Sequence, residues 1–561
     1  MASQQRSCLG RTLRVWRSVT IGVVTAFSIS LMPTLAQDAT PGGASGSVVV
    51  QPGELTQARP YLLAEDPSQL AITPLLTSGE SVGDYQMAGT PDGLGAYRDG
   101  DDVVVFMNHE WRTDEGEHIS DARVSRLTLD PATGAVRSGS YPIDGSEGYW
   151  SFCSAFLAGP EVGFDSPVFL TGEESTGGEH GGLSLAVDGA TSEVTELPWL
   201  GHIRHENQVV VPGFSGKTVV VTTDDDAASS ELYLFVADSP ADVLSGNGQL
   251  YVFTADDAAG TADIAKGDEL TGAFVPVDEA DNADPDSLQE AVDAAGAFKF
   301  VRLEDVTYDR TTTTTIYFTD TGDNEDPNLA TPTGDPVNAN GRLYRLALDP
   351  VDPTQVTSLQ VLLDGDAGDD LRNPDNLDAN ATTIMLQEDL NGYNRAADSD
   401  ATGRILSYDI ASGALTSIAK IDQSDDPSLV VEPGDEAGSW ESSGIIDVSD
   451  LFGAGSWLVD VQAHTLEVNQ FGDVDEGGQL LLLRQTTLEA ATPEAAVSTA
   501  GATVASEPTA VPAETVVPVE TAVPVETAAP AETPEPAETV APTSEAPEPT
   551  SEASPVARRA P

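Results

Sequence analysis

The chain has 561 residues, with 25 lysines and arginines against 92 aspartates and glutamates, a formal net charge of −67 at pH 7. This balance excludes a nucleic-acid-binding function, because contacts to phosphate backbones require Lys and Arg. The acidic excess instead fits a strongly solvated surface for most of the acids and divalent-cation sites for a minority of them.

The first 36 residues have the pattern of a secretory signal peptide. Arginines up to Arg17 precede an apolar stretch over residues 18–32, and Thr34, Leu35 and Ala36 fit a small-residue cleavage site. The stretch is shorter than the roughly 20 residues needed to span a bilayer, so we expect no stable membrane insertion after cleavage. We therefore expect a secreted protein, extracellular or associated with the cell surface.

Residues 37–83 are expected to pack on the folded region or to lead into it, and we place that region at residues 84–489. From residue 490 to residue 561 the chain consists largely of Ala, Pro, Thr, Val and Glu, and prolines recur every six residues from Pro512 to Pro542. Such a composition cannot bury enough apolar surface to offset its ordering entropy. It predicts a disordered, extended tail.

Six segments of the folded region repeat one pattern. A polar or thiol residue opens a short apolar run, a turn follows, and a second apolar run ends in further polar groups. The six openings are Asp92, Cys153, Glu206, Glu304, Asp375 and Glu441, and the polar ends are Glu110, Glu174, Asp226, Asp323, Asp389 and His464. Partly alternating runs follow the second runs at 123–130, 231–238, 341–349 and 403–409, which indicates half-buried antiparallel strands.

Six repeated strand pairs predict an all-β fold, namely a six-bladed β-propeller with long loops. In such a fold the innermost strands begin around a central channel, so the six openings should meet there. Residues 254–300 read as an inserted acidic segment, in which residues 287–295 are the best helical candidate. A monomer is expected.

The openings would bring five carboxylates and one thiol together. Burying several carboxylates side by side is costly, and bound cations remove that cost. Oxygen ligands suit Ca²⁺, whereas a thiolate with carboxylates suits a transition metal such as iron. Cys153 is the one cysteine outside the expected signal peptide. It is either a small buried hydrophobe or a metal thiolate.

Arg302 lies two residues before Glu304, so on a strand both side chains would point to one face. A guanidinium beside a metal cluster can clamp a phosphate or carboxylate, or it can simply balance Glu304 as an ion pair. His109, His205 and His464 sit beside the candidate ligands. Each of them is at least as well explained by packing, or by contact with a ligand residue, as by direct metal binding.

At these residues the chain resembles the PhoX-type alkaline phosphatases, over roughly residues 84–483. The resemblance is carried by six motifs: AsnHisGlu at 108–110, Cys153 followed by GluGlu at 173–174, HisGlu at 205–206, ArgLeuGluAsp at 302–305, AsnProAspAsnLeu at 373–377 and GlnAlaHis at 462–464. It implies a six-bladed propeller that hydrolyses small-molecule phosphomonoesters at a cluster of Ca²⁺ and Fe³⁺ at the channel mouth.

The resemblance also implies roles for individual residues. Arg302 would hold phosphate and Glu304 would serve both catalysis and metal binding. The other expected metal ligands are Asn108, Cys153, Glu173 or Glu174, and Glu206, and the ring of openings adds Asp92 and Asp375. The metals would act as Lewis acid and as the source of the nucleophile.

Two other functions fit the same residues. One is a non-catalytic calcium-binding propeller that serves in adhesion or scaffolding. The other is a different metal hydrolase on the same scaffold, such as a lactonase-like enzyme, because propellers host many chemistries. Cys153 best distinguishes the phosphatase from the calcium-binding propeller, since a purely calcium-binding module has no need of a thiol.

Overall fold

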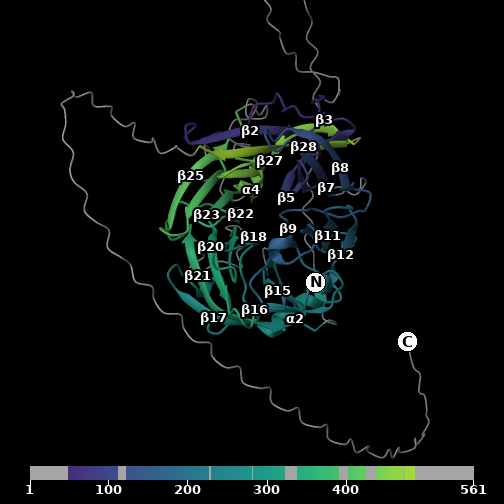
Figure 1. Cartoon of the computed structure of the whole chain (residues 1–561). Helices are drawn as coiled ribbons and strands as arrows, with labels where there is room; N and C mark the ends of the chain where they lie inside the picture. The colour runs from purple at the N-terminus through teal and green to yellow at the C-terminus, as the bar shows by residue number, and fades with distance from the viewer. Residues whose placement is uncertain are drawn as a thin grey trace, which may run out of the picture. The chain divides into compact units, whose positions relative to one another are not determined.

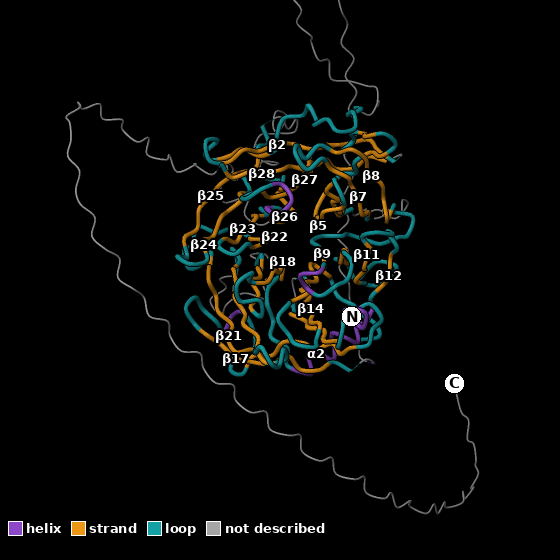
Figure 2. The backbone as a smooth tube through the Cα atoms, in the orientation of Figure 1, coloured by secondary structure: helices purple, strands orange, loops and turns teal. Residues whose placement is uncertain are grey.

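The described residues of the computed structural model fold almost entirely into antiparallel β-strands. They are residues 48–111, 122–226, 229–278, 280, 282–322, 338–390, 402–424, 438–471 and 473–486, all within the unit Met1–Ala491. The expected signal peptide, the tail from residue 490 and the polar residue Asp323 lie outside them. Strands dominate the trace, with a few short helices between them (Figure 2).

Two four-stranded sheets come first along the chain, with the orders β5-β6-β7-β8 and β12-β11-β10-β9. Their strands are β5 (Pro91–Asp99), β6 (Asp102–His109), β7 (Arg123–Leu129), β8 (Val136–Ile143), β9 (Phe156–Ala158), β10 (Val168–Gly172), β11 (Ser184–Asp188) and β12 (Val194–Glu196). In both sheets the strands follow one another as an antiparallel meander.

A nine-stranded sheet follows, which consists of two meanders and a bridging strand. The strands are β13 (His205–Val211), β14 (Thr218–Asp224), β15 (Leu232–Ala237), β16 (Gly248–Ala255), β17 (Glu269–Pro276), β18 (Leu303–Tyr308), β19 (Thr315–Asp320), β20 (Arg342–Leu348) and β21 (Gln355–Asp364). β17 pairs with β16 on one side and with β21 on the other. It comes from the inserted acidic segment and joins the two meanders into one sheet.

The last two large sheets each add an N-terminal strand to a C-terminal meander. One contains β22 (Pro374–Ala379), β23 (Thr383–Glu388), β24 (Arg404–Asp409) and β25 (Ala414–Ile421), and the other β26 (Glu441–Asp447), β27 (Ser456–Gln470) and β28 (Asp473–Gln485). β1 (Leu62–Ala64) pairs with β25, and β2 (Leu70–Thr77) pairs with β28. The short β3 (Ser81–Val82) and β4 (Tyr85–Gln86) form a hairpin.

The first strand of each meander contacts the first strand of the next around a closed circuit, in the order β5, β9, β13, β18, β22, β26 and back to β5. The sheets accordingly follow one another around a common centre (Figure 1). The all-β, propeller-like prediction is confirmed. Hydrogen bonding gives five large sheets rather than six separate ones, because β17 pairs with both of its neighbouring meanders.

Helices are short throughout the described part of the chain. They are α1 (Pro240–Val243), α2 (Pro285–Ala295) and α4 (Ser449–Phe452), with the 3₁₀ turns η1 (Pro160–Val162), η2 (Pro198–Leu200) and η3 (Thr261–Asp263). α2 contains the predicted helical stretch; Asp284 caps its N-terminus by accepting from the Ser287 N–H, and Gly296 ends it in the left-handed conformation. None of these helices is long and apolar enough to cross a bilayer.

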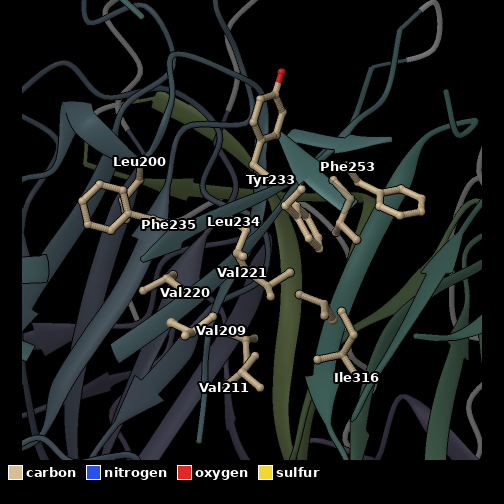
Figure 3. Close-up of a cluster of buried hydrophobic side chains, with 14 of the residues drawn as sticks. Leu200, Val209, Val211, Val220, Val221, Tyr233, Leu234, Phe235, Phe253 and Ile316 are labelled. Atoms are coloured by element: carbon tan, nitrogen blue, oxygen red, sulfur yellow. The ribbon is translucent and has the colours of Figure 1, made fainter. Parts of the chain in front are cut away.

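Apolar side chains fill the spaces between adjacent sheets. On β14 the consecutive residues Val220 and Val221 are both fully buried, although successive strand residues point to opposite faces. Val209 and Val211 of β13 and Ile316 of β19 belong to the same buried cluster (Figure 3). This strand therefore has neighbours on both faces, which explains its continuous run of valines.

Candidate metal centre

The six openings predicted from the sequence come together at the beginnings of the first strands of the meanders. Asp92, Glu206, Glu304 and Asp375 are the second residues of β5, β13, β18 and β22, Glu441 is the first residue of β26, and Cys153 lies just before β9. Three further acids join them from the ends of the second strands: Glu110 after β6, Glu174 after β10 and Asp389 after β23.

These nine residues, which we call the acid ring, form four linked groups that could each hold a cation. Within each group the ligand atoms lie within 4.8 Å of one another. The groups are Asp92–Glu110–Cys153, Cys153–Glu174–Glu206, Glu206–Glu304–Asp375 and Asp375–Asp389–Glu441. Because Cys153, Glu206 and Asp375 are each shared by two groups, the ring is one continuous arrangement of ligand atoms.

A repeated backbone turn builds this ring. The residue two positions before the opening residue has a positive φ in four meanders, namely Thr90 (38°), Ser151 (54°), Arg302 (55°) and Asn373 (43°). Its carbonyl accepts from the backbone N–H at the end of the adjacent strand, at Glu110 (2.9 Å), Glu174 (2.8 Å), Thr321 (2.9 Å) and Asp389 (3.0 Å). Such strained non-glycine residues concentrate at functional sites. Sequence reasoning missed this turn, because none of the four is a glycine.

Burial and mutual repulsion make the ring electrostatically costly without cations. Burial, followed by Glu110 and Glu441, raises the pKa of Asp92 well above its ordinary value. Burial, followed by neighbouring carboxylates of the ring, likewise raises the pKa of Glu206 and of Asp375. Cations placed among these oxygens would relieve both the desolvation and the repulsion.

Cys153 lies at the junction of two groups. Its Sγ donates to Glu174 Oε2 at 2.8 Å, and Ser151 Oγ donates to the same oxygen at 3.0 Å. Burial, followed by Glu110 and Glu174, raises the pKa of this thiol. A thiol in such surroundings stays protonated in the absence of a metal, and a bound transition-metal cation would favour the thiolate.

Asn108 is oriented by the loop that carries Cys153. Its Nδ2 donates to the Cys153 carbonyl oxygen at 2.6 Å and to Thr171 Oγ1 at 2.8 Å. Its Oδ1 is buried and has no hydrogen-bond partner among the described residues. A buried amide oxygen without a donor suits a hard cation such as Ca²⁺.

The GluGlu pair divides between two environments. Glu174 belongs to the acid ring, whereas Glu173 lies outside the four groups. Glu173 is fully buried and accepts from the backbone N–H groups of Trp150 (3.0 Å) and Leu183 (3.1 Å). The structure therefore brings Asp92, Cys153, Glu174, Glu206, Glu304 and Asp375 together as metal-ligand candidates and ties Glu173 to the backbone.

Arg302 lies beside the ring, between two carboxylates. Its Nε and Nη2 each lie 3.1 Å from an oxygen of Asp225, and Nη2 is also 3.1 Å from Glu304 Oε1. Burial and then Asp225 raise the pKa of Glu304, while Arg302 lowers it. The ion pair between Arg302 and Glu304 that the sequence suggested is therefore present, and it holds the guanidinium at the edge of the acid ring.

The three histidines have different roles. His109 contacts the Gly89 carbonyl oxygen at 2.8 Å and Ser125 Oγ at 2.7 Å, and burial lowers its pKa to about 3. His205 contacts the Gly201 carbonyl oxygen at 3.0 Å, and burial also lowers its pKa to about 3. Both fill packing roles. His464 instead reaches the ring, since its Nε2 lies 3.4 Å from Glu441 Oε1.

Glu110, Asp389 and Glu441 belong to the ring but not to the ligands expected from the sequence. Glu441 is an opening residue of the repeated sequence pattern, and Glu110 and Asp389 are polar ends of it. This recurrence is the signal that could have identified them as ligands. Gln462 adds a neutral contact, because its Nε2 donates to Asp92 Oδ2 at 3.2 Å and to Glu110 Oε2 at 2.9 Å.

Comparison with known proteins agrees with the motifs. Residues 177–436 match the model of the family described as alkaline phosphatase PhoX. The Pseudomonas fluorescens PhoX structure in complex with vanadate, a transition-state analogue, has 13% identity to the chain and a TM-score of 0.55. The alignment covers 77% of this chain and 97% of that one. At this identity the structural likeness bears on the fold alone.

Other solved structures are more distant. A GH43_1 enzyme from Xanthomonas citri complexed with xylotriose has 11% identity and a TM-score of 0.31 over 74% of this chain and 90% of that one. A glycosyl hydrolase from Bacteroides ovatus has 10% identity and a TM-score of 0.30 over 60% and 88%. These scores are too low to carry an argument. No curated protein matches the chain. The resemblance to the PhoX-type alkaline phosphatase family, which the motifs predicted, is confirmed by the family match over residues 177–436.

Proposed function

We propose that the protein is a secreted, metal-dependent phosphatase that hydrolyses small-molecule phosphomonoesters at the acid ring. The observation that carries the proposal is the convergence of eight carboxylates and one thiol in the four linked groups of the acid ring. The match to the PhoX family over residues 177–436 supports the reaction class.

The ligand chemistry of the ring divides it into two kinds of cation site. The two groups that share Cys153 combine a thiol with carboxylates, which suits Fe³⁺. The two groups around Asp375 consist of carboxylates alone, which suits Ca²⁺, and the unpartnered Asn108 Oδ1 adds a neutral oxygen near Cys153. When bound, such metals supply Lewis acidity and an activated oxygen nucleophile.

The residues around the ring have separate tasks in this proposal. Arg302 binds the phosphoryl oxygens of the substrate, because a guanidinium matches their geometry and charge. Glu304 binds the metals, and its ion pair with Arg302 keeps that guanidinium at the edge of the acid ring. His464 places a positive charge beside Glu441 of the ring: burial lowers the pKa of His464, but Glu441 and Glu476 outweigh burial and raise it.

The architecture is proposed to contain six blades. The two meanders of the nine-stranded sheet, β13–β16 and β18–β21, each contribute one first strand to the closed circuit, so each counts as one blade. The remaining four meanders supply the others. In this proposal residues 84–489 form the propeller, residues 37–83 pack on it or lead into it, residues 1–36 are a signal peptide, and residues 490–561 lie outside the propeller.

A calcium-binding module without catalysis is the second candidate. It is favoured by the two groups that lack a thiol, since carboxylate oxygens alone suit Ca²⁺. The two candidates differ in what Cys153 does. Only the phosphatase requires iron at the thiol-containing groups.

Metal analysis of the purified full-length protein, together with an assay on p-nitrophenyl phosphate, tests the proposal. We expect both calcium and iron in the protein, a visible Fe³⁺–thiolate absorption band, and hydrolysis that stops when the metals are chelated. Calcium without iron, together with no hydrolysis after loading with both metals, would favour the binding module instead.

A further inference from the structure

We infer that Asp225 is a positioning residue for Arg302 and not a metal ligand, although it occupies the place that metal-ligand candidates occupy in other meanders. The inference rests on the proposed function, since Arg302 is taken to bind the phosphoryl group. It concerns a residue for which the sequence suggested nothing beyond an acidic strand end.

The repeated turn shows which residues are equivalent. The backbone N–H of Asp225 donates to the Arg204 carbonyl oxygen at 2.9 Å, two residues before the opening residue Glu206. Glu110, Glu174 and Asp389 make the same bond, to Thr90, Ser151 and Asn373 respectively. Asp225 is therefore the counterpart of these three ring acids in the β13–β16 meander.

The side chains of these equivalent residues nevertheless differ in what they contact. Glu110, Glu174 and Asp389 each belong to one of the four groups of the acid ring, and Asp225 belongs to none of them. The two oxygens of Asp225 instead accept from Arg302 Nε and Nη2, both at 3.1 Å. The carboxylate that would complete a further group is used as a two-point clamp on the guanidinium.

The backbone of Arg302 is anchored to the same neighbouring meander. Its φ of 55° places it in the left-handed region, which is strained for an arginine. The N–H of the next residue, Leu303, donates to Ser230 Oγ at 2.8 Å, and Ser230 Oγ donates to the Asp224 carbonyl oxygen at 2.7 Å. Main chain and side chain of Arg302 are thus both fixed from the segment that carries Asp225.

The Asp225 clamp also limits how strongly the Arg302 guanidinium pairs with Glu304 of the acid ring. Glu304 Oε1 competes for Arg302 Nη2 at the same 3.1 Å. Removing the Asp225 charge would leave Glu304 as the dominant anionic partner, and the guanidinium would turn toward that metal-ligand candidate and away from the substrate phosphate. A misplacement of about 1 Å at a positioning group costs roughly 100-fold in rate.

The variant Asp225→Asn tests this role, with Asp226→Asn as matched control. Asp226 is the adjacent acid and its carboxylate pairs with Arg204. In Asp225→Asn protein loaded with Ca²⁺ and Fe³⁺, we expect the Kd for inorganic phosphate, measured by calorimetry, and the KM for p-nitrophenyl phosphate to rise at least about 10-fold, because the guanidinium is no longer held in place. Metal content should stay at the wild-type value. Asp226→Asn should change the phosphate Kd less than about twofold, as expected for a group away from the clamp.

A double-mutant cycle with Arg302→Lys completes the test. If Asp225 acts through Arg302, Asp225→Asn should weaken phosphate binding little further in the Arg302→Lys background. An unchanged phosphate Kd in Asp225→Asn, a loss of bound metal, or full additivity with Arg302→Lys would each overturn the inference. Wild-type protein that binds phosphate without hydrolysing esters would overturn only the proposed function, whereas wild-type protein that binds no phosphate would overturn both.

Discussion

The Cys153 thiol and the Glu174 carboxylate are direct partners, with 2.8 Å between Sγ and Oε2. They flank two neighbouring strands, since Cys153 precedes β9 and Glu174 follows β10. Cys153 links two groups of the acid ring, because it belongs to both, and Glu174 belongs to one of them. A cation that takes up the thiolate must therefore displace a proton that the thiol now shares with Glu174.

Replacing this thiol tests the iron site. In Cys153→Ser we expect loss of bound iron and of the thiolate absorption band, because a neutral serine hydroxyl is a poorer ligand for a transition metal than an anionic thiolate. Calcium content should be largely retained, since the two groups around Asp375 contain no thiol. Elemental analysis and visible spectra of the purified variant measure both; unchanged iron in Cys153→Ser would exclude Cys153 as a ligand.

The two adjacent glutamates form a natural matched pair. Glu174→Gln should lower metal content and activity, because it removes a charge from the ring. Glu173→Gln should leave the metal content unchanged but lower the thermal stability, because its two oxygens accept from the Trp150 and Leu183 backbone N–H groups. The pair is compared by elemental analysis and melting curves, and the reverse order of effects would assign the ligand role to Glu173.

Asp305 connects the first strands β13, β18 and β22, which are not paired directly with one another in a sheet. Its carboxylate accepts from the Asn207 side chain of β13, from the Val306 N–H (2.7 Å) and from the Leu377 N–H of β22 (3.0 Å). Asp305→Ala should lower the free energy of unfolding by about 3 kcal/mol, because it leaves buried donors unsatisfied. Denaturant unfolding provides the measurement, with Glu290→Ala on the exposed side of α2 as a control expected to cost below about 0.5 kcal/mol. Equal costs for both variants would contradict the bridging role.

We expect the melting temperature of the protein to depend on pH because of Asp320. Burial raises the pKa of Asp320 to about 7, against the opposing effects of Arg342 and the Tyr344 hydroxyl. A folded-state pKa above the unfolded value means that this stabilising contribution is complete below about pH 4 and is lost as the pH rises toward 7. Asp320→Asn should therefore flatten the fall in melting temperature between pH 4 and 7. An identical pH profile in wild type and variant would show that Asp320 does not titrate in this range.

The sequence predicted the ring better than it predicted the sheets. Asp92, Glu206, Glu304 and Asp375 could be recognised because each opens an apolar run, and that local pattern positions them at the start of a first strand. The joining of two meanders by β17 could not be predicted, since its pairing with β21 depends on a contact between distant segments.

Two details of the site also lay beyond the sequence. Glu173 and Glu174 are adjacent and chemically alike, and only the path of the chain after β10 decides which of them faces the ring. The use of Asp225 as a clamp depends on the left-handed turn at Arg302, a residue type that gives no local signal for a positive φ.

The rate of p-nitrophenyl phosphate hydrolysis by metal-stripped full-length protein, reconstituted with Ca²⁺ alone, Fe³⁺ alone or both, tests the central claim most directly. The proposed function predicts hydrolysis only when both metals are present, because the thiol-containing groups are proposed to hold Fe³⁺ and the carboxylate-only groups Ca²⁺. Full hydrolysis by the stripped protein, or with Ca²⁺ alone, would contradict it.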